Sequence, residues 1–457
     1  MRLFYTLAIL SWGATKAHAQ VVCAHFMAAN AQTYSEKDWK NDISLAKEAH
    51  IDAFALNMAH SDVSNKSLTM AFDEAQAQGF KLFISFDYAG NGSWPIKDTI
   101  NLMDQFKDHP AYFKYESRPV MSTFEGASSR DWPKIKNETD SFFIPDWSSL
   151  APNAANKTFV DGLFNWAAWP TGPSRMNTDA DHAYIDALNG RPYMMPVSPW
   201  FYTNMPGFGK NWVSRGDDLW YDRWQQVLDL QPELVEIISW NDYGESHYIG
   251  PLRDKAFGAF SVGKAPFNYA KNMPHDGWRK FLPYVIDQYK NPNKSIAITK
   301  EDVVTWYRLR PKNACNTGGT TGNSKSQGVK EYPPSEIVED KVFYSALLNS
   351  TADVVVEIGD KKVNGKWANV PDGGRGLYHG SVPFDNSVGE VRVSIARNQK
   401  EIASIKGKAI TAECPDDNKG MQNYNAWVGA GNTLSLSLRM SSFLAILVVA
   451  VVELGLF

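Results

Sequence analysis

Cysteine is scarce in this chain, and neither sign of charge dominates it. Three cysteines among 457 residues exclude a disulfide-dense scaffold and a zinc site built from cysteines. Cys23 lies in an apolar run and is expected to be a buried free thiol, whereas a bond between Cys315 and Cys414 would suit an oxidising compartment. The 46 basic and 50 acidic residues give a net charge of −4, which favours neither nucleic acid nor an anionic surface as a partner. No compact metal-ligand spacing occurs either, so no metal or cofactor is expected.

Long apolar runs are also missing, except at the two ends of the chain, which we expect to be targeting segments. Residues 1–19 combine a basic start, a short apolar core and a small-residue cleavage site, which is typical of a signal peptide. An N-terminal membrane anchor is the alternative, but a span needs about 20 apolar residues. Residues 432–457 run from a polar spacer into an apolar terminus, the pattern of a glycolipid (GPI) anchor signal, with a tail anchor as the alternative. The protein is therefore expected to be secreted or at the cell surface.

Aromatic residues and glycosylation triplets are abundant. The 16 Trp, 19 Tyr and 24 Phe favour a carbohydrate ligand, because flat sugar faces stack on aromatic rings. Asn-x-Ser/Thr triplets are consistent with export. One of them, at Asn91, lies so close to the predicted cleft that no glycan is expected there. The triplets at which glycosylation is predicted begin at Asn65, Asn137, Asn156, Asn293 and Asn349.

Between residues 20 and 300, short apolar runs alternate with helix-like segments. Helical periodicity occurs over 38–49, 66–78 and 96–107. Eight strands separated by helices predict an α/β protein built on a (β/α)8 TIM barrel, which we take as the catalytic domain. An open doubly wound sheet is the alternative, but the first run lacks a glycine-rich phosphate turn after it. The eight runs are 21–27, 52–58, 81–88, 120–124, 142–144, 162–166, 193–197 and 234–239.

The pattern changes beyond residue 300. Residues 313–326 are rich in Gly, Thr, Asn and Ser, which indicates a loop. Short alternating runs predict a smaller all-β, sandwich-like accessory domain over 301–415, followed by a linker over 416–431. We expect this domain to pack on the barrel, with sugar binding as the alternative. The alternating runs are 341–348, 352–360, 391–397 and 401–407.

Polar and aromatic residues follow the ends of the predicted strands, where barrel enzymes carry their catalytic groups. The densest cluster is 240–248 (WNDYGESHY), in which one short turn could aim the carboxyls of Asp242 and Glu245 into a single cleft. Each residue taken alone is more often structural, so it is the recurrence at successive strand ends that predicts a site. The predicted substrate-binding residues are His25, Asn57, His60, Tyr88, Glu125, Asp146, Trp166, Trp169, Trp200, Trp240, Asn241, Tyr243 and His247.

Five segments of the chain are shared with a known protein family: 24–27 (AHFM), 51–58 (IDAFALNM), 82–88 (LFISFDY), 122–126 (STFEG) and 238–251 (ISWNDYGESHYIGP). They resemble fungal glycoside hydrolase family 71, the α-1,3-glucanases or mutanases. The resemblance implies a glucan endo-1,3-α-glucosidase that hydrolyses α-1,3-glucan, a fungal wall polymer, with inversion at the anomeric carbon. It also implies that Asp242 and Glu245 are catalytic, and Asp87 is similar to an Asp implicated in activity.

Hydrolysis of a glycosidic bond needs a proton for the leaving oxygen and a nucleophile on the other face of the sugar, and two carboxyls can provide both. The working assignment is Glu245 as general acid and Asp242 as base, and the reverse is nearly as well supported. Asp87 could raise the pKa of the acid, or be the base itself with Asp242 in support. Glu125 is a weaker candidate for a carboxyl that takes part in the acid–base chemistry.

Two other functions stay open from the sequence. One is a non-catalytic wall-binding glycoprotein at the cell surface, and the other is a hydrolase of a different glucan. In each case the expected partner is a polysaccharide, with membrane attachment through a GPI anchor, and the chain is expected to be a monomer.

Overall fold

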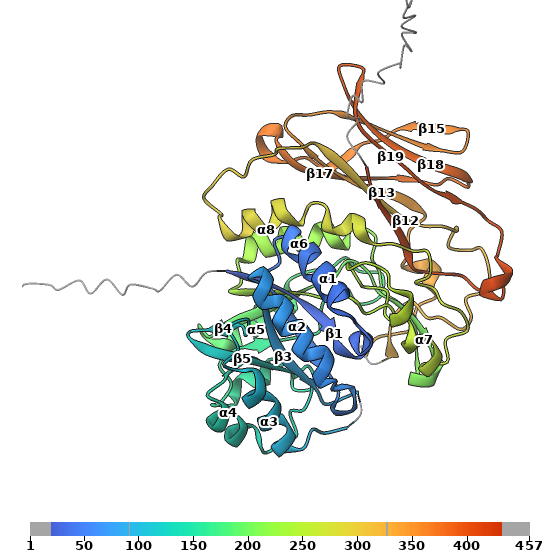
Figure 1. The fold of residues 1–457 in the computed structure, drawn as a ribbon. Helices are drawn as coiled ribbons and strands as arrows, with labels where there is room; N and C mark the ends of the chain where they lie inside the picture. The colour runs from blue at the N-terminus through green and yellow to red at the C-terminus, as the bar shows by residue number, and fades with distance from the viewer. Residues whose placement is uncertain (1–19, 91, 326–327, 432–457) are drawn as a thin grey trace, which may run out of the picture.

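The computed structural model describes residues 20–90, 92–325 and 328–431 (Figure 1). The targeting segments predicted at 1–19 and 432–457, and the triplet residue Asn91, lie outside the described residues. Within those ranges, no helix is long and apolar enough to cross a membrane.

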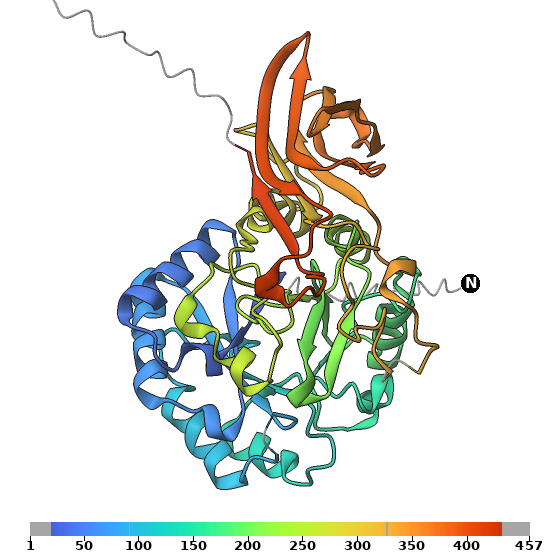
Figure 2. The same ribbon diagram turned by 90° about the vertical axis from the view of Figure 1, so that its right-hand side faces the viewer.

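Eight parallel strands curl into an α/β barrel (Figures 1 and 2). β6 (Phe142–Phe143) pairs with β5, and isolated parallel bridges from Asp146 to Phe124 and to Phe164 link the two ends of the sheet. Each of the eight predicted apolar runs overlaps one of these strands, so the α/β barrel prediction is confirmed. The other strands, in order of pairing, are β5 (Arg118–Phe124), β3 (Lys81–Asp87), β2 (Ala53–Met58), β1 (Val21–Met27), β11 (Leu234–Ile237), β8 (Tyr193–Val197) and β7 (Leu163–Phe164), with the short β4 (Lys114–Tyr115) antiparallel to β5.

Helices cover the outer face of the barrel and side chains fill its interior. The strands are therefore buried on both faces, which is why their sequences are continuous apolar runs. Every residue of β2 and β11 is buried. The helix that follows β2 ends at Gly79, whose φ of 66° is left-handed and favours glycine. The helices are α1 (Glu36–Glu48), α2 (Asn65–Gln78), α3 (Ile96–Phe106), α4 (Trp132–Thr139), α5 (Asp179–Leu188), α6 (Leu219–Leu230), α7 (Gly258–Val262) and α8 (Leu282–Lys290).

Two antiparallel sheets lie beside the barrel, next to α6 and α8 (Figure 1). The first has the strand order β16-β17-β13-β12-β20 and the second β15-β14-β18-β19. The bounds in the first sheet are β16 (Trp367–Asn369), β17 (Gly376–Pro383), β13 (Lys341–Leu348), β12 (Asp302–Arg308) and β20 (Ala426–Ala430). Those in the second are β15 (Lys361–Asn364), β14 (Asp353–Ile358), β18 (Gly389–Arg397) and β19 (Lys400–Ile410).

One segment differs from its prediction. The range 416–431 was expected to be a linker, but β20 lies within it and pairs with β12. The sequence AWVGA is short and contains a glycine, and its pairing partner lies far back in the chain, so no local pattern marks it as a strand. Cys315 and Cys414, at the start and end of this C-terminal region, form a disulfide with Cα atoms 5.4 Å apart, and Cys23 is buried and free.

The first sheet packs on the barrel through aromatic rings and hydrogen bonds. His379 of β17 lies between the rings of Tyr221 from α6 (4.6 Å) and Trp306 from β12 (5.6 Å). Its Nε2 atom is 2.8 Å from Asp218 Oδ1, and Trp306 Nε1 donates to the carbonyl of Asp217 at 2.7 Å. These contacts join the two parts of the chain.

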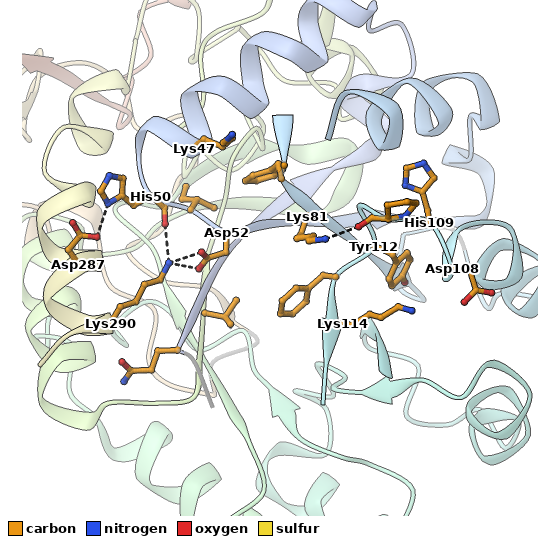
Figure 3. A pocket seen from close by; sticks show the side chains of 17 residues that line it. Lys47, His50, Asp52, Lys81, Asp108, His109, Tyr112, Lys114, Asp287 and Lys290 are labelled. Carbon is orange, nitrogen blue, oxygen red and sulfur yellow. Dashed lines mark hydrogen bonds and ion pairs between the residues drawn. The ribbon is translucent and has the colours of Figure 1, made fainter. Parts of the chain in front are cut away.

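A cavity of about 850 Å³ opens at the N-terminal ends of β1, β2 and β3 (Figure 3). Lys290 forms an ion pair with Asp52 at 2.6 Å, and His50 forms a hydrogen bond with Asp287 at 2.7 Å, so these contacts tie α8 to the turn before β2. In α/β barrels this face serves stability, and the chemistry lies at the other end. The candidate site is therefore sought at the C-terminal ends of the strands.

Candidate active site

The two carboxyls predicted from the strand-end cluster meet in one turn after β11. The backbone N–H of Glu245 donates to Asp242 Oδ1 at 3.0 Å. Between the carboxyls lies the imidazole of His247, with Nε2 at 3.1 Å from Glu245 Oε2 and 4.0 Å from Asp242 Oδ2. Its Nδ1 atom is 2.8 Å from Ser239 Oγ, which also accepts the backbone N–H of Asp242 at 2.9 Å. Ser239 therefore holds both the imidazole and the turn.

A lysine that the sequence did not point to completes this cluster. Lys210 Nζ lies 2.6 Å from Glu245 Oε1. It belongs to β10 (Lys210–Val213), which forms a hairpin with β9 (Tyr202–Met205) after β8. No local motif marks Lys210, because its partner is 35 residues further along the chain.

The pKa values of the two carboxyls are shifted in opposite directions by their surroundings. Burial opposes ionisation of Glu245, but the charge of Lys210 and the hydrogen bond from His247 outweigh it and hold the pKa of Glu245 well below its usual range. Burial and the nearby Glu245 carboxylate raise the pKa of Asp242. Of the two carboxyls, Asp242 is therefore the one that binds a proton more readily. This favours Asp242 as the acid, the reverse of the working assignment made from the sequence.

The pair is compact. One oxygen each from Asp242 and Glu245 and one ring nitrogen of His247 lie within 4.8 Å of one another. Three such groups could ligate a cation, but the ammonium of Lys210 already supplies the positive charge at Glu245.

Asp87, the third predicted acid, ends β3 and is fixed by a tight turn. Its Oδ1 accepts the backbone N–H groups of Ala89 and Gly90, both at 2.8 Å. A Cβ at position 90 would lie 2.7 Å from Asp87 Oδ2, so the turn needs glycine there. The charge of Glu245 is the main cause that raises the pKa of Lys210, and the charges of Asp242 and Asp87 contribute to it.

Half-buried tryptophans flank the imidazole. The rings of Trp166 and Trp169, both predicted from the sequence, lie 6.5 Å and 5.4 Å from that of His247. Phe201 contacts Trp169 at 4.9 Å and stacks in parallel on Trp212 of β10 at 5.4 Å. Trp212 is also half-buried, and sequence reasoning missed it. The rings thus form a continuous track from the barrel centre to the hairpin that carries Lys210.

Four of the predicted binding residues are buried and bonded within the fold. Trp200, Trp240, Asn241 and Tyr243 are all at most 1% exposed. Trp200 Nε1 donates to the carbonyl of Tyr424 at 2.9 Å, and Tyr243 OH donates to that of Pro251 at 2.7 Å. Asn241 bonds both main-chain polar groups of Met27, and Trp240 packs against Phe54. Trp240, Asn241 and Tyr243 thereby fix the turn that follows β11.

Three others lie inside the barrel below the mouth. His25 Nδ1 is 2.8 Å from the buried carboxyl of Glu236, and the His25 ring meets the edge of Trp166 at 4.8 Å. Asn57 accepts from Ser85 Oγ at 3.3 Å. Asp146 is fully buried, and burial raises its pKa well above the usual value. These residues support the site from beneath.

Of the last three predicted residues, Tyr88 and Glu125 directly follow strands, and His60 begins a short 3-10 helix (His60–Asp62). Glu125 accepts hydrogen bonds from the backbone and hydroxyl of Ser149. Burial raises the pKa of Tyr88 to about 12, and its ring packs on Trp132. His60 is exposed and lies 2.9 Å from Asp98. The structure does not bring these three into contact with the acid pair. All five triplet asparagines at which glycosylation was predicted are exposed.

Comparison with known proteins gives consistent matches over the chain. The family model described as Glycosyl hydrolase family 71 matches residues 18–439. A mutanase of Penicillium rubens is 36% identical over 90% of this chain and 88% of its own length. A glucan endo-1,3-alpha-glucosidase of Schizosaccharomyces pombe is 32% identical over 90% of this chain and 94% of its own. An ascus wall endo-1,3-alpha-glucanase of the same yeast is 30% identical over 65% of this chain and 73% of its own.

Proposed function

The chain belongs to glycosyl hydrolase family 71, and from this we propose that it is a glucan endo-1,3-α-glucosidase that hydrolyses α-1,3-glucan. Two relatives with such activities in their names match nearly the whole chain. The observation that carries the proposal is the pair Asp242 and Glu245, which one turn presents beside His247 and Lys210 at the barrel mouth.

Each carboxyl has one role in the proposed reaction. Asp242 holds the proton and transfers it to the O3 atom of the departing glucose as the bond from the anomeric carbon to that oxygen breaks. Glu245, ionised beside Lys210, takes a proton from the water that forms the new bond to the anomeric carbon. Both groups then carry the opposite protonation state, and exchange with solvent resets them. Separated pKa values of this kind are how paired carboxyls divide acid and base work.

The stereochemical course that we propose is inversion, as the family resemblance implies. An inverting enzyme keeps its two carboxyls about 6.5–9.5 Å apart to leave room for water, and the nearest oxygens of Asp242 and Glu245 lie within 4.8 Å of each other. Asp87 is the second candidate for the base, because it is the remaining predicted acid whose charge acts on Lys210. Proton NMR of freshly released sugar tests the course. The β anomer is expected first, and an α anomer would mean retention.

The aromatic track supplies the binding surface in this proposal. Trp166, Trp169 and Trp212 are half-buried, so part of each ring is open to a ligand. Aromatic faces of this kind bind the apolar faces of glucose rings. The track passes His247, and a chain bound along it would place one of its bonds beside the acid pair.

The remaining features describe where the enzyme works. We propose export after removal of residues 1–19 and anchoring through a GPI signal at 432–457, with the enzyme acting as a monomer. Supporting this are a disulfide that suits an oxidising compartment and a relative named for the ascus wall. The barrel over 20–300 is the proposed catalytic domain, and the two sheets between 302 and 430 form the accessory β-sandwich.

The direct test is release of reducing ends from insoluble polysaccharides. The wild type is expected to degrade α-1,3-glucan and to leave other α- and β-glucans intact. Asp242→Asn and Glu245→Gln should each lose about 10²–10⁴-fold in turnover, whereas Asp104→Asn, an exposed carboxyl on α3, serves as the matched control. Binding of α-1,3-glucan without release would instead identify a non-catalytic wall-binding protein.

A further inference from the structure

Lys210 reaches Glu245 from a hairpin whose other face is held by a loop outside the barrel. Successive strand residues point to opposite faces. Lys210 and Trp212 therefore share one face of β10, and Asn211 and Val213 the other. The first face meets Glu245 and the aromatic track. The second meets residues 316–321, which run down from the β sheets beside the hairpin (Figure 2).

Four hydrogen bonds hold the hairpin to this loop. Asn211 Nδ2 donates to the carbonyl of Gly318 at 2.9 Å, and Thr320 Oγ1 donates to Asn211 Oδ1 at 2.6 Å, so both ends of the amide are engaged. In the main chain, Thr321 N–H donates to the Asn211 carbonyl at 3.3 Å, and Val213 N–H donates to that of Thr321 at 3.0 Å. Three of these four bonds are made by Asn211, the residue that directly follows Lys210 in the sequence.

The loop is itself fixed at its base. The disulfide between Cys315 and Cys414 immediately precedes it. Asn316 N–H donates to the carbonyl of Gly420 at 3.0 Å, and Gln422 N–H donates to that of Asn316 at 2.7 Å. The turn that follows uses Gly318 and Gly319, with φ of 62° and 81°, the left-handed region that glycine tolerates. Thr320 is only 5% exposed, so its hydroxyl has little access to competing water.

We propose that residues 316–321 are a positioning element of the active site, acting through Asn211 to keep Lys210 against Glu245. The need for such an element follows from lysine itself, whose ammonium sits on a flexible four-carbon stem. The side chain of Lys210 is 40% exposed, so packing alone does not fix it. With the backbone at Asn211 held, the ammonium stays at Glu245 and the base stays ionised at low pH. The inference rests on the proposed function.

The test is the pH profile of kcat/KM on soluble α-1,3-gluco-oligosaccharides. Thr320→Val removes the hydroxyl that bonds Asn211 and keeps the shape of the side chain. We expect the acid limb of the profile to move to higher pH, in the direction that Lys210→Met moves it but by less. Thr320→Ser should behave as the wild type. Thr305→Val is the matched control, because Thr305 is also buried and its hydroxyl donates to the carbonyl of Phe343 at 2.7 Å within the β sheet.

A double variant separates positioning from a general loss of stability. In the Lys210→Met background, Thr320→Val should cause no further movement of the acid limb. The proposal would be overturned if Thr320→Val moves the acid limb equally in the wild-type and Lys210→Met backgrounds. It would also be overturned if Lys210→Met moves the acid limb and Thr320→Val leaves it unchanged. If Thr320→Val does not fold, Asn211→Ala gives the same readings. A wild type that releases no sugar would refute the proposed function instead, before these variants are compared.

Discussion

Replacing Lys210 by methionine tests the electrostatics of the site in the most direct way. Two unit charges 2.6 Å apart attract by about 1.6 kcal/mol at the dielectric constant of water, or roughly one pKa unit. Glu245 is buried, which lowers the local dielectric constant, although exposure of Lys210 works against this. An opposite charge at this range typically lowers a carboxyl pKa by about 1–3 units, and we expect Lys210→Met to raise the pKa of Glu245 by a similar amount.

The sign of the effect on activity follows from the role of Glu245. The base must be ionised, so activity is lost as pH falls through its pKa, and a higher pKa moves the acid limb of kcat/KM to higher pH. Lys210 also lowers the pKa of Asp242, so the alkaline limb should move upward too. Lys210→Arg keeps the charge and should leave both limbs near those of the wild type.

The assay is kcat/KM against pH on soluble α-1,3-gluco-oligosaccharides, with folding checked by circular dichroism. Lys290→Met is the matched control, because it removes a lysine from an ion pair with Asp52 at the opposite end of the barrel. An acid limb that stays in place in Lys210→Met, or moves to lower pH, would refute the account of Glu245 as a base held ionised by Lys210.

Three further predictions concern binding and stability. Trp212→Ala should raise KM for long α-1,3-gluco-oligosaccharides about tenfold, or ~1.4 kcal/mol, whereas Trp212→Phe keeps a stacking ring and should lose less; equal KM values in all three proteins would remove Trp212 from the binding track. Trp240→Ala should lower the free energy of unfolding by about 3–5 kcal/mol, because the ring is fully buried; an unchanged denaturant midpoint would contradict its structural role. Burial raises the pKa of Asp217 to about 7, so the wild type should lose stability as pH rises from about 4 to 7, while Asp217→Asn should not. Thermal unfolding of both proteins across that range checks this, and parallel curves would contradict it.

The barrel could be predicted because its signals are local. Parallel strands covered by helices are continuous apolar runs, and the run 193–197 coincides with β8. Three helices were also predicted from their periodicity, among them the segment 66–78, which corresponds to α2. β20 was missed because its identity as a strand depends on pairing with β12, which lies more than 100 residues earlier. The local sequence does not identify a pairing partner that lies so far away in the chain.

The site residues also fall into those that a local motif predicts and those that depend on distant parts of the chain. Asp242 and Glu245 share one turn, so their meeting could be read from the motif alone. Lys210 and Trp212 come from a hairpin of two four-residue strands whose position depends on a loop that follows the barrel. The direction in which each side chain points could not be predicted from the sequence either. Trp240 and Tyr243 flank the acids in sequence but turn into the core, whereas Trp166 and Trp169 remain partly open.

The measurement that bears most directly on the central claim compares two substrates in two variants. A glycosyl fluoride of an α-1,3-gluco-oligosaccharide needs no proton for its leaving group, whereas the glucan does. We predict that Asp242→Asn loses activity on the glucan yet keeps most of it on the fluoride, and that Glu245→Gln loses activity on both. The reverse pattern would assign the acid to Glu245, and full activity of either variant on the glucan would show that the turn after β11 does not carry the chemistry.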